Sequence, residues 1–113
     1  MADRNYLFIC SQNKLRSPTA EHIFADLDGV ETLSAGTNRD AETPLSDELI
    51  EWADFVFVME RAHRTKVEKR HRSVLKGKHV IVLDIPDEYK FMDPHLVRLL
   101  KTKMRRWLPI EDK

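Results

Sequence analysis

The sequence has little of what staples a small secreted domain or anchors a chain in a membrane. Cys10 is the single cysteine among 113 residues, which excludes an intramolecular disulfide and a cluster of thiolate metal ligands. No apolar run approaches the roughly 20 residues that a membrane-spanning helix needs, and the first residues lack the apolar stretch of a secretion signal. With three glycines and 42% hydrophobic residues, the composition is typical of a globular protein. We therefore expect one cytoplasmic domain over residues 1–113, with no membrane partner.

Neither sign of charge is in excess, because 19 Lys and Arg residues balance 19 Asp and Glu residues. The distribution is uneven, since residues 61–79 contain eight bases and a single acid, Glu68. No aromatic residue lies between these bases, as a nucleic-acid stacking surface would need, so we interpret the run as a solvated helix face. The same run contains His63, His71 and His79. They have no carboxylate or thiol at metal-ligand spacing, so we expect them at the surface.

Short apolar runs alternate with segments of helical period, in the order βαβαβαβα. The expected strands are 6–9, 30–34, 55–59 and 79–83. The expected helices are 17–27 with Ser17 as cap, 44–53 with Leu45, Leu49 and Trp52 toward the core, a basic helix before the last strand, and a final helix from Pro94 that places Trp107 in the core. Strands separated by helices predict an α/β fold with a parallel sheet. In such sheets ligands bind beyond the carboxyl ends of the strands, where the strand order reverses.

The residues that follow the first strand carry the chemistry. Cys10 and Arg16 are separated by the five residues Ser11, Gln12, Asn13, Lys14 and Leu15, between a strand end and a helix start. A loop over a helix N-terminus points several backbone N–H groups at one position, so we expect it to bind phosphate or a similar anion such as sulfate. Arg16 adds a fixed fork of donors that can hold two phosphate oxygens at once.

The same surroundings favour the thiolate of Cys10, which makes this residue a candidate nucleophile. The competing interpretation is a small apolar side chain at a strand end. Ser17 can donate its hydroxyl to the sulfur, with the helix cap as its alternative role. We expect Asn13 to adopt a left-handed backbone conformation and to contact Ser34; otherwise it is a plain polar loop residue.

Several segments together resemble the low-molecular-weight protein tyrosine phosphatases. The active-site signature of that family is similar to Leu7-Phe8-Ile9-Cys10, Asn13, Arg16-Ser17-Pro18 and Ala20-Glu21. Further likeness lies in Ser34-Ala35-Gly36-Thr37, in residues 53–60, and in Ile85-Pro86-Asp87-Glu88-Tyr89, which resembles the loop of the general acid. The resemblance implies a phosphotyrosine phosphatase I-like fold, with one doubly wound four-stranded parallel sheet flanked by helices. It also implies a phosphocysteine intermediate and no metal or other cofactor.

The sequence departs from the family pattern at identifiable positions. Gln12 stands where the family has glycine, and Leu15 stands where it has a second cysteine, so the family's protective disulfide cannot form. Members of the family are longer between Thr37 and Ala53, where they carry part of the wall on the substrate side. Glu88 replaces a proline in the acid loop.

The resemblance assigns the general acid to the loop after the last strand. Asp87 is our choice, with Asp84 and Asp93 as rivals, although Asp93 also fits the cap of the last helix. Tyr89, alone or with Phe91, is a candidate aromatic wall for a phenyl ring. The alternative for Tyr89 is ordinary packing of a loop aromatic.

We expect hydrolysis of phosphate monoesters, with phosphotyrosine in a protein or a small aryl phosphate as substrate. Cys10 would attack phosphorus, Arg16 and the loop would hold its oxygens, and Asp87 would act as acid and then as base. One alternative is an arsenate reductase-like enzyme on the same fold, although versions that pass a disulfide between their own cysteines need more than Cys10. The other is a non-catalytic module that binds phosphate, or RNA through residues 61–79.

Overall fold

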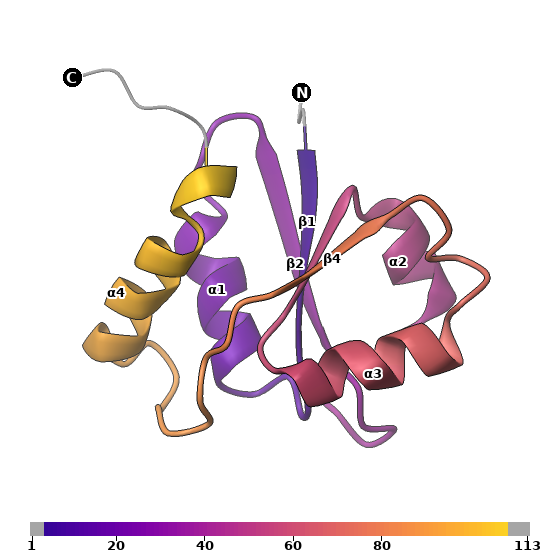
Figure 1. Ribbon diagram of the computed structural model, residues 1–113. Coiled ribbons are helices and arrows are strands. Elements are labelled where there is room, and N and C mark those ends of the chain that lie inside the picture. Colours follow the sequence, from indigo (N-terminus) through magenta and orange to yellow (C-terminus); the bar gives the residue numbers. More distant parts are fainter. Residues whose placement is uncertain (1–3, 109–113) are drawn as a thin grey trace.

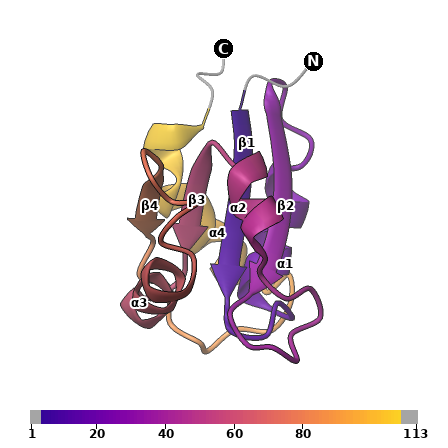
Figure 2. The ribbon, with the colours of Figure 1, turned by 90° about the vertical axis from the view of Figure 1, so that its right-hand side faces the viewer.

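A computed structural model describes residues 4–108 of the protein. A parallel sheet forms its centre. Within this range the sheet consists of four strands: β1 (Arg4–Cys10), β2 (Val30–Gly36), β3 (Phe55–Val58) and β4 (His79–Val82). Figure 1 shows the sheet nearly edge-on. The strand order is β2-β1-β3-β4, seen from right to left in Figure 2. The prediction of a four-stranded parallel sheet is confirmed.

Helices cover both faces of this sheet. They are α1 (Arg16–Phe24), α2 (Asp47–Trp52), α3 (Arg61–Arg70) and α4 (Pro94–Lys103), followed by the short 3-10 helix η1 (Arg105–Trp107). Figure 2 shows α2 and α3 on the near face and α1 and α4 on the opposite face. The crossovers therefore use both faces, and the sheet is doubly wound as predicted.

Residues 6–9 of β1 are fully buried because each face of the sheet is covered. Tyr6 and Phe8 belong to the core under α1 and α4, whereas Leu7 and Ile9 belong to the core under α2 and α3. Side chains alternate between the two faces of a strand, so a strand covered on both sides reads as a continuous apolar run.

The second helix is shorter than predicted. It spans Asp47–Trp52 rather than 44–53, because the backbone of Pro44 is paired in a β-bridge instead of lying in a helix. Ser46 caps the helix, and its side chain accepts a 3.3 Å hydrogen bond from the backbone N–H of Leu49. The helix therefore begins after a serine cap and not at the proline.

The predicted core face of this helix is also wrong in part. Leu45, Leu49 and Trp52 are only half-buried and pack at the margin of the core, whereas Ile50 is the fully buried side chain. Trp107 packs against the other core from η1 and stays half-buried. None of the helices in the described part of the chain has the length and apolar character needed to cross a membrane.

The strand order positions the functional site. β1 lies between β2 and β3 in the sheet. After β1 the chain forms β2 on one side of it, and then crosses to form β3 on the other side. Cys10, the last residue of β1, is therefore at the reversal point where open α/β sheets bind ligands. A Cβ on Gly36, at the end of β2, would lie 2.5 Å from both the Ser11 carbonyl oxygen and the Ala41 Cβ. Glycine thus lets the loop after β2 pack closely on the residues that follow Cys10.

Candidate active site

The cysteine loop (residues 10–17) joins β1 to α1 and places a hydroxyl and a backbone amide against the sulfur of Cys10. Cys10 is 4% exposed, and its Sγ shares a 2.9 Å hydrogen bond with the Ser17 hydroxyl. The backbone N–H of Asn13 donates to the same sulfur over 3.3 Å. A hydroxyl, an amide and the N-terminal end of a helix all interact more favourably with a thiolate than with a thiol. These polar contacts distinguish Cys10 from a cysteine that only fills space.

The prediction that Ser17 caps the first helix is wrong. α1 begins at Arg16 and ends at Phe24, and the residue at its cap position, Leu15, makes no side-chain cap. Ser17 is therefore already inside the first turn, and its hydroxyl contacts the Cys10 sulfur instead of a helix N–H. Two roles were considered for Ser17, a helix cap and a contact with the sulfur, and the structure shows the contact with the sulfur.

Asn13 shapes the turn of the cysteine loop. Its φ is 60°, in the left-handed region that asparagine tolerates better than most residues. Its side-chain amide donates to the Ser17 hydroxyl over 3.0 Å and to the Ser34 hydroxyl over 2.8 Å. Both expected features of Asn13 are present. Gln12 needs no left-handed backbone, because Asn13 is the one described loop residue with positive φ.

The guanidinium of Arg16 is held by residues that follow the last two strands of the sheet. Its Nη1 donates to the Glu60 carboxylate and, over 2.7 Å, to the carbonyl oxygen of Ile85. The Asp87 carboxylate lies 3.8 Å from its Nε, and the Arg16 side chain is buried. Because Glu60 follows β3 and Ile85 follows β4, the carboxyl ends of both strands hold Arg16 in place.

One cavity of about 190 Å³ brings the three predicted catalytic residues together. Cys10, Arg16 and Asp87 line it, and the loop residues Ser11, Gln12, Lys14 and Leu15 complete the wall. Asp87 reaches the cavity from the loop after β4 and is largely exposed. A candidate nucleophile, a fixed cation and a carboxyl group thus line one cavity from two segments of the chain, the cysteine loop and the loop after β4.

The other candidates from the acid loop lie elsewhere. Asp93 caps α4, with its carboxylate accepting from the backbone N–H of His95 over 2.8 Å, which confirms the cap. Asp84 is exposed and does not line the cavity. Tyr89 packs against the core and is absent from the cavity wall, so the aromatic wall expected from it is replaced by ordinary packing.

His63 was predicted at the surface, and this prediction is wrong. It is 3% exposed, its Nε2 lies 2.9 Å from the Ser11 hydroxyl, and its Nδ1 accepts from the backbone N–H of Glu60 over 3.1 Å. Because Nδ1 is an acceptor, the ring proton is on Nε2 and is donated to Ser11. Burial, and then the positive charge of Arg16, lower the pKa of His63 to about 4. A neutral imidazole therefore supports the cysteine loop at neutral pH.

A sequence signal for His63 existed. Glu60 and His63 form the capping box of α3, a helix-start pattern in which residues three apart bond each other's backbone. β3 also adjoins β1 in the sheet, so the residues after β3 lie next to those after β1. Two more histidines lie in the basic run of residues 61–79. His79 is exposed as predicted, whereas His71 is half-buried and contacts Asp47. Within residues 4–108 no group of His, Cys, Asp or Glu side chains could hold a metal ion.

Comparisons with known proteins match the fold. No protein-family model and no curated protein matches the sequence. The tyrosine phosphatase Wzb from Escherichia coli K30, solved with phosphate, aligns with a TM-score of 0.72 at 24% identity, over 95% of this chain and 96% of that one. The YwlE arginine phosphatase from Geobacillus stearothermophilus aligns at 0.70 and 21%, over 96% and 99%. SP-PTP, a low molecular weight protein tyrosine phosphatase from Streptococcus pyogenes, aligns at 0.76 and 14%, over 92% and 90%.

The chain has the fold of these phosphatases. In this phosphatase fold the cysteine loop lies at the reversal point of the sheet, between the ends of β2 and β3. What the site can do follows from its own groups: a sulfur held by Ser17 and Asn13, a rigid guanidinium and an accessible carboxyl group. Together they suit nucleophilic attack on an oxyanion ester.

Proposed function

We propose that this protein is a cysteine-dependent phosphatase that hydrolyses phosphate monoesters through a phosphocysteine intermediate. The observation that carries the proposal is the shared cavity of Cys10, Arg16 and Asp87, in which the sulfur also contacts the Ser17 hydroxyl. The phosphatases with this fold support it. In this proposal Arg16 and the N–H groups of the cysteine loop bind the phosphate group.

The first step transfers the phosphoryl group to sulfur. The Cys10 thiolate attacks phosphorus, an S–P bond forms, and the bond between phosphorus and the ester oxygen breaks. Arg16 and the loop N–H groups hold the three non-bridging oxygens while their charge is redistributed, and such positioning supplies most of the catalysis in phosphoryl transfer. Asp87, as the carboxylic acid, gives its proton to the departing oxygen.

The second step regenerates the enzyme. The Asp87 carboxylate takes a proton from a water molecule that attacks phosphorus, an O–P bond forms, and the S–P bond breaks. The sulfur leaves as a thiolate, which the Ser17 hydroxyl and the Asn13 N–H stabilise. Inorganic phosphate is the product.

We propose phosphotyrosine in proteins, and aryl phosphates generally, as the substrate class. Leu15 is exposed on the cavity wall and offers an apolar surface to a phenyl ring. Lys14 adds a positive charge to the same wall, which disfavours phosphoarginine because its leaving group carries a guanidinium. Rates on phosphotyrosine and phosphoarginine peptides should therefore favour phosphotyrosine, and Lys14→Gln should narrow the ratio. A wild-type preference for phosphoarginine would refute this choice of substrate.

Turnover of p-nitrophenyl phosphate by wild type and Cys10→Ser tests the proposed activity. We expect the variant to lose activity by roughly 10³ or more while keeping its circular dichroism spectrum, because serine is a far weaker nucleophile at neutral pH. Equal turnover would remove Cys10 from the mechanism. Phosphate binding without turnover of any ester by wild type would favour the non-catalytic module.

The arsenate reductase alternative needs a relay of thiols. A version that passes a disulfide between its own cysteines is incompatible with Cys10 as the single cysteine. Assay of arsenate reduction with an added thiol, beside the phosphatase assay, separates the two activities.

A further inference from the structure

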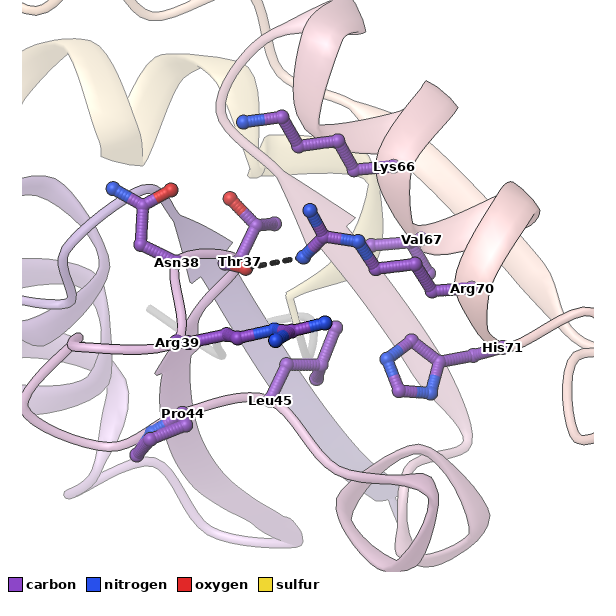
Figure 3. Close-up of a pocket in the computed structure, with 9 residues that line it drawn as sticks. All are labelled: Thr37, Asn38, Arg39, Pro44, Leu45, Lys66, Val67, Arg70 and His71. Atoms are coloured by element: carbon purple, nitrogen blue, oxygen red, sulfur yellow. Dashed lines mark hydrogen bonds between the residues drawn. The ribbon is translucent and has the colours of Figure 1, made fainter.

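A second cavity lies between the 37–45 loop and α3, and Figure 3 shows its side chains. Its volume is about 320 Å³, and it shares no lining residue with the cavity at Cys10. The loop contributes Thr37 and Arg39, and α3 contributes Lys66 and Arg70. Part of the basic run that the sequence indicated to be a solvated face is therefore turned toward this cavity.

Most of the charged side chains that line the cavity are basic, and one lining residue, His71, contacts the Asp47 carboxylate. Arg39, Lys66 and Arg70 all line it, and no Asp or Glu is among the described residues of its wall. None of the three forms an ion pair within the described part of the chain. Three cations around one recess repel one another unless an anion neutralises them.

A hydrogen bond to the 37–45 loop holds the Arg70 guanidinium. Its Nη1 donates to the backbone carbonyl oxygen of Thr37 over 2.7 Å, drawn as the dashed line in Figure 3, which fixes the guanidinium at the rim of the loop. A guanidinium has five N–H donors in a rigid plane, so this one bond leaves most of the fork for an anion. The half-buried Lys66 approaches the same space from one turn earlier on α3.

Thr37 supplies an independent observation. The residue is 5% exposed, and its Oγ1 is the one buried side-chain nitrogen or oxygen in residues 4–108 without a hydrogen-bond partner. Buried hydroxyls are almost always paired, because an unpaired one loses its hydration without compensation. Thr37 lines the same cavity as Lys66 and Arg70, and Figure 3 shows the three side chains around it. An acceptor placed among these groups would satisfy the hydroxyl and the cations together.

We propose that this cavity is a second oxyanion site, which binds a phosphate group with the Thr37 hydroxyl as a donor and with Lys66, Arg70 and Arg39 as its cations. Phosphate suits the site because it is a tetrahedral dianion that accepts several charge-assisted hydrogen bonds at once. The group can be inorganic phosphate or the phosphate of an ester. Binding here needs no chemistry at Cys10, so the site is independent of the proposed activity.

Titration of ¹⁵N-labelled protein with inorganic phosphate at constant ionic strength tests the proposal. We expect two sets of saturating amide shifts, one in residues 10–17 and one in residues 37–39 and 66–70. The double variant Lys66→Ala/Arg70→Ala should weaken the second set about tenfold or more, because charged hydrogen bonds are lost, and should leave the first set in place. Shifts confined to residues 10–17 in wild type would overturn the proposal.

A matched control separates a built site from a diffuse positive field. Lys69→Ala/Arg72→Ala removes one lysine and one arginine from the same basic run, at positions that do not line this cavity. The control should retain both sets of shifts. Equal weakening of the second set in the two double variants would refute a specific site.

Thr37 provides the sharpest variants. Thr37→Val keeps the shape of the side chain and removes the hydroxyl, so without phosphate it should be as stable as wild type or more stable. Phosphate should then raise the melting temperature of wild type and of Thr37→Ser more than that of Thr37→Val. An identical rise in all three proteins would contradict the assigned role of the hydroxyl.

The two sources of the phosphate group are distinguished in the Cys10→Ser background, where an ester is not consumed. If glycerol 3-phosphate shifts the amide signals of residues 37–39 and 66–70, the site also accepts phosphate esters. Shifts there with inorganic phosphate alone support a site for the free anion. Absence of shifts there with both probes overturns the proposal.

Discussion

Replacing His63 by glutamine tests how the cysteine loop is held. Glutamine does not titrate, and its amide can still donate toward Ser11, the contact that the imidazole Nε2 makes over 2.9 Å. The variant therefore removes one ionisation from the interior and preserves much of the packing. His95 is an exposed histidine on α4, so His95→Gln is the matched control.

The size of the effect follows from the pKa of His63. Burial and the Arg16 charge lower that pKa from 6.5 to about 4, with Lys66 acting in the same direction and Glu60 and Asp87 against it. The unfolded chain therefore binds the proton more tightly than the folded protein, and stability falls as pH decreases from 6.5 toward 4. At about 1.4 kcal/mol for each pKa unit, the full loss is about 3 kcal/mol.

Urea unfolding across this pH range measures the loss. Wild type and His95→Gln should lose about 3 kcal/mol more than His63→Gln between roughly pH 7 and pH 4. The stability difference between wild type and His63→Gln should therefore shrink as the solution becomes acidic. A constant difference at all pH values would refute the assignment of His63 as a buried neutral imidazole.

Three further variants test the cysteine loop and the acid. Asp87→Asn should slow hydrolysis of phenyl phosphate by roughly 10² to 10⁴ but affect p-nitrophenyl phosphate far less, because only the poorer leaving group needs the proton. Asp84→Asn is its control, and a larger effect there would move the acid to Asp84. Ser17→Ala should lower kcat by roughly tenfold to a hundredfold, since the sulfur loses a donor; an unchanged kcat would contradict that role. Asn13→Gly should keep the turn but lower both the melting temperature and kcat, because the bonds to Ser17 and Ser34 are lost; unchanged values would refute this positioning.

Much of the fold was predictable because local patterns agree with the global structure. The apolar run of residues 6–9 predicted a strand buried on both faces of the sheet, and these residues lie in such a strand. Asp93 followed by Pro94 predicted the start of α4. The bounds of α1 were not predictable from capping rules. Ser17 has the residue type of a cap, but its hydroxyl contacts Cys10, a tertiary contact that local propensity does not contain.

The residues of the candidate site also fall into those that the sequence indicated and those that only the fold brings together. Cys10, Arg16 and the residues between them are contiguous in sequence, so spacing alone indicated them. Glu60 and His63 lie far along the chain and reach the cysteine loop only because β3 pairs with β1. The second cavity was also not predictable from the sequence, because no pattern in the basic run separates Lys66 and Arg70 from the other bases. These two residues line the cavity because α3 packs beside the 37–45 loop.

Trapping the covalent intermediate is the most direct measurement of the central claim. Wild type mixed with an aryl phosphate is quenched during turnover, digested and analysed by mass spectrometry for phosphorylated peptides. We expect phosphate on the peptide that contains Cys10, at a higher level in Asp87→Asn when the leaving group is p-nitrophenol, because breakdown of the intermediate then lacks its base. Turnover with no phosphate on Cys10 in either protein, or with phosphate on another residue, would contradict a phosphocysteine mechanism.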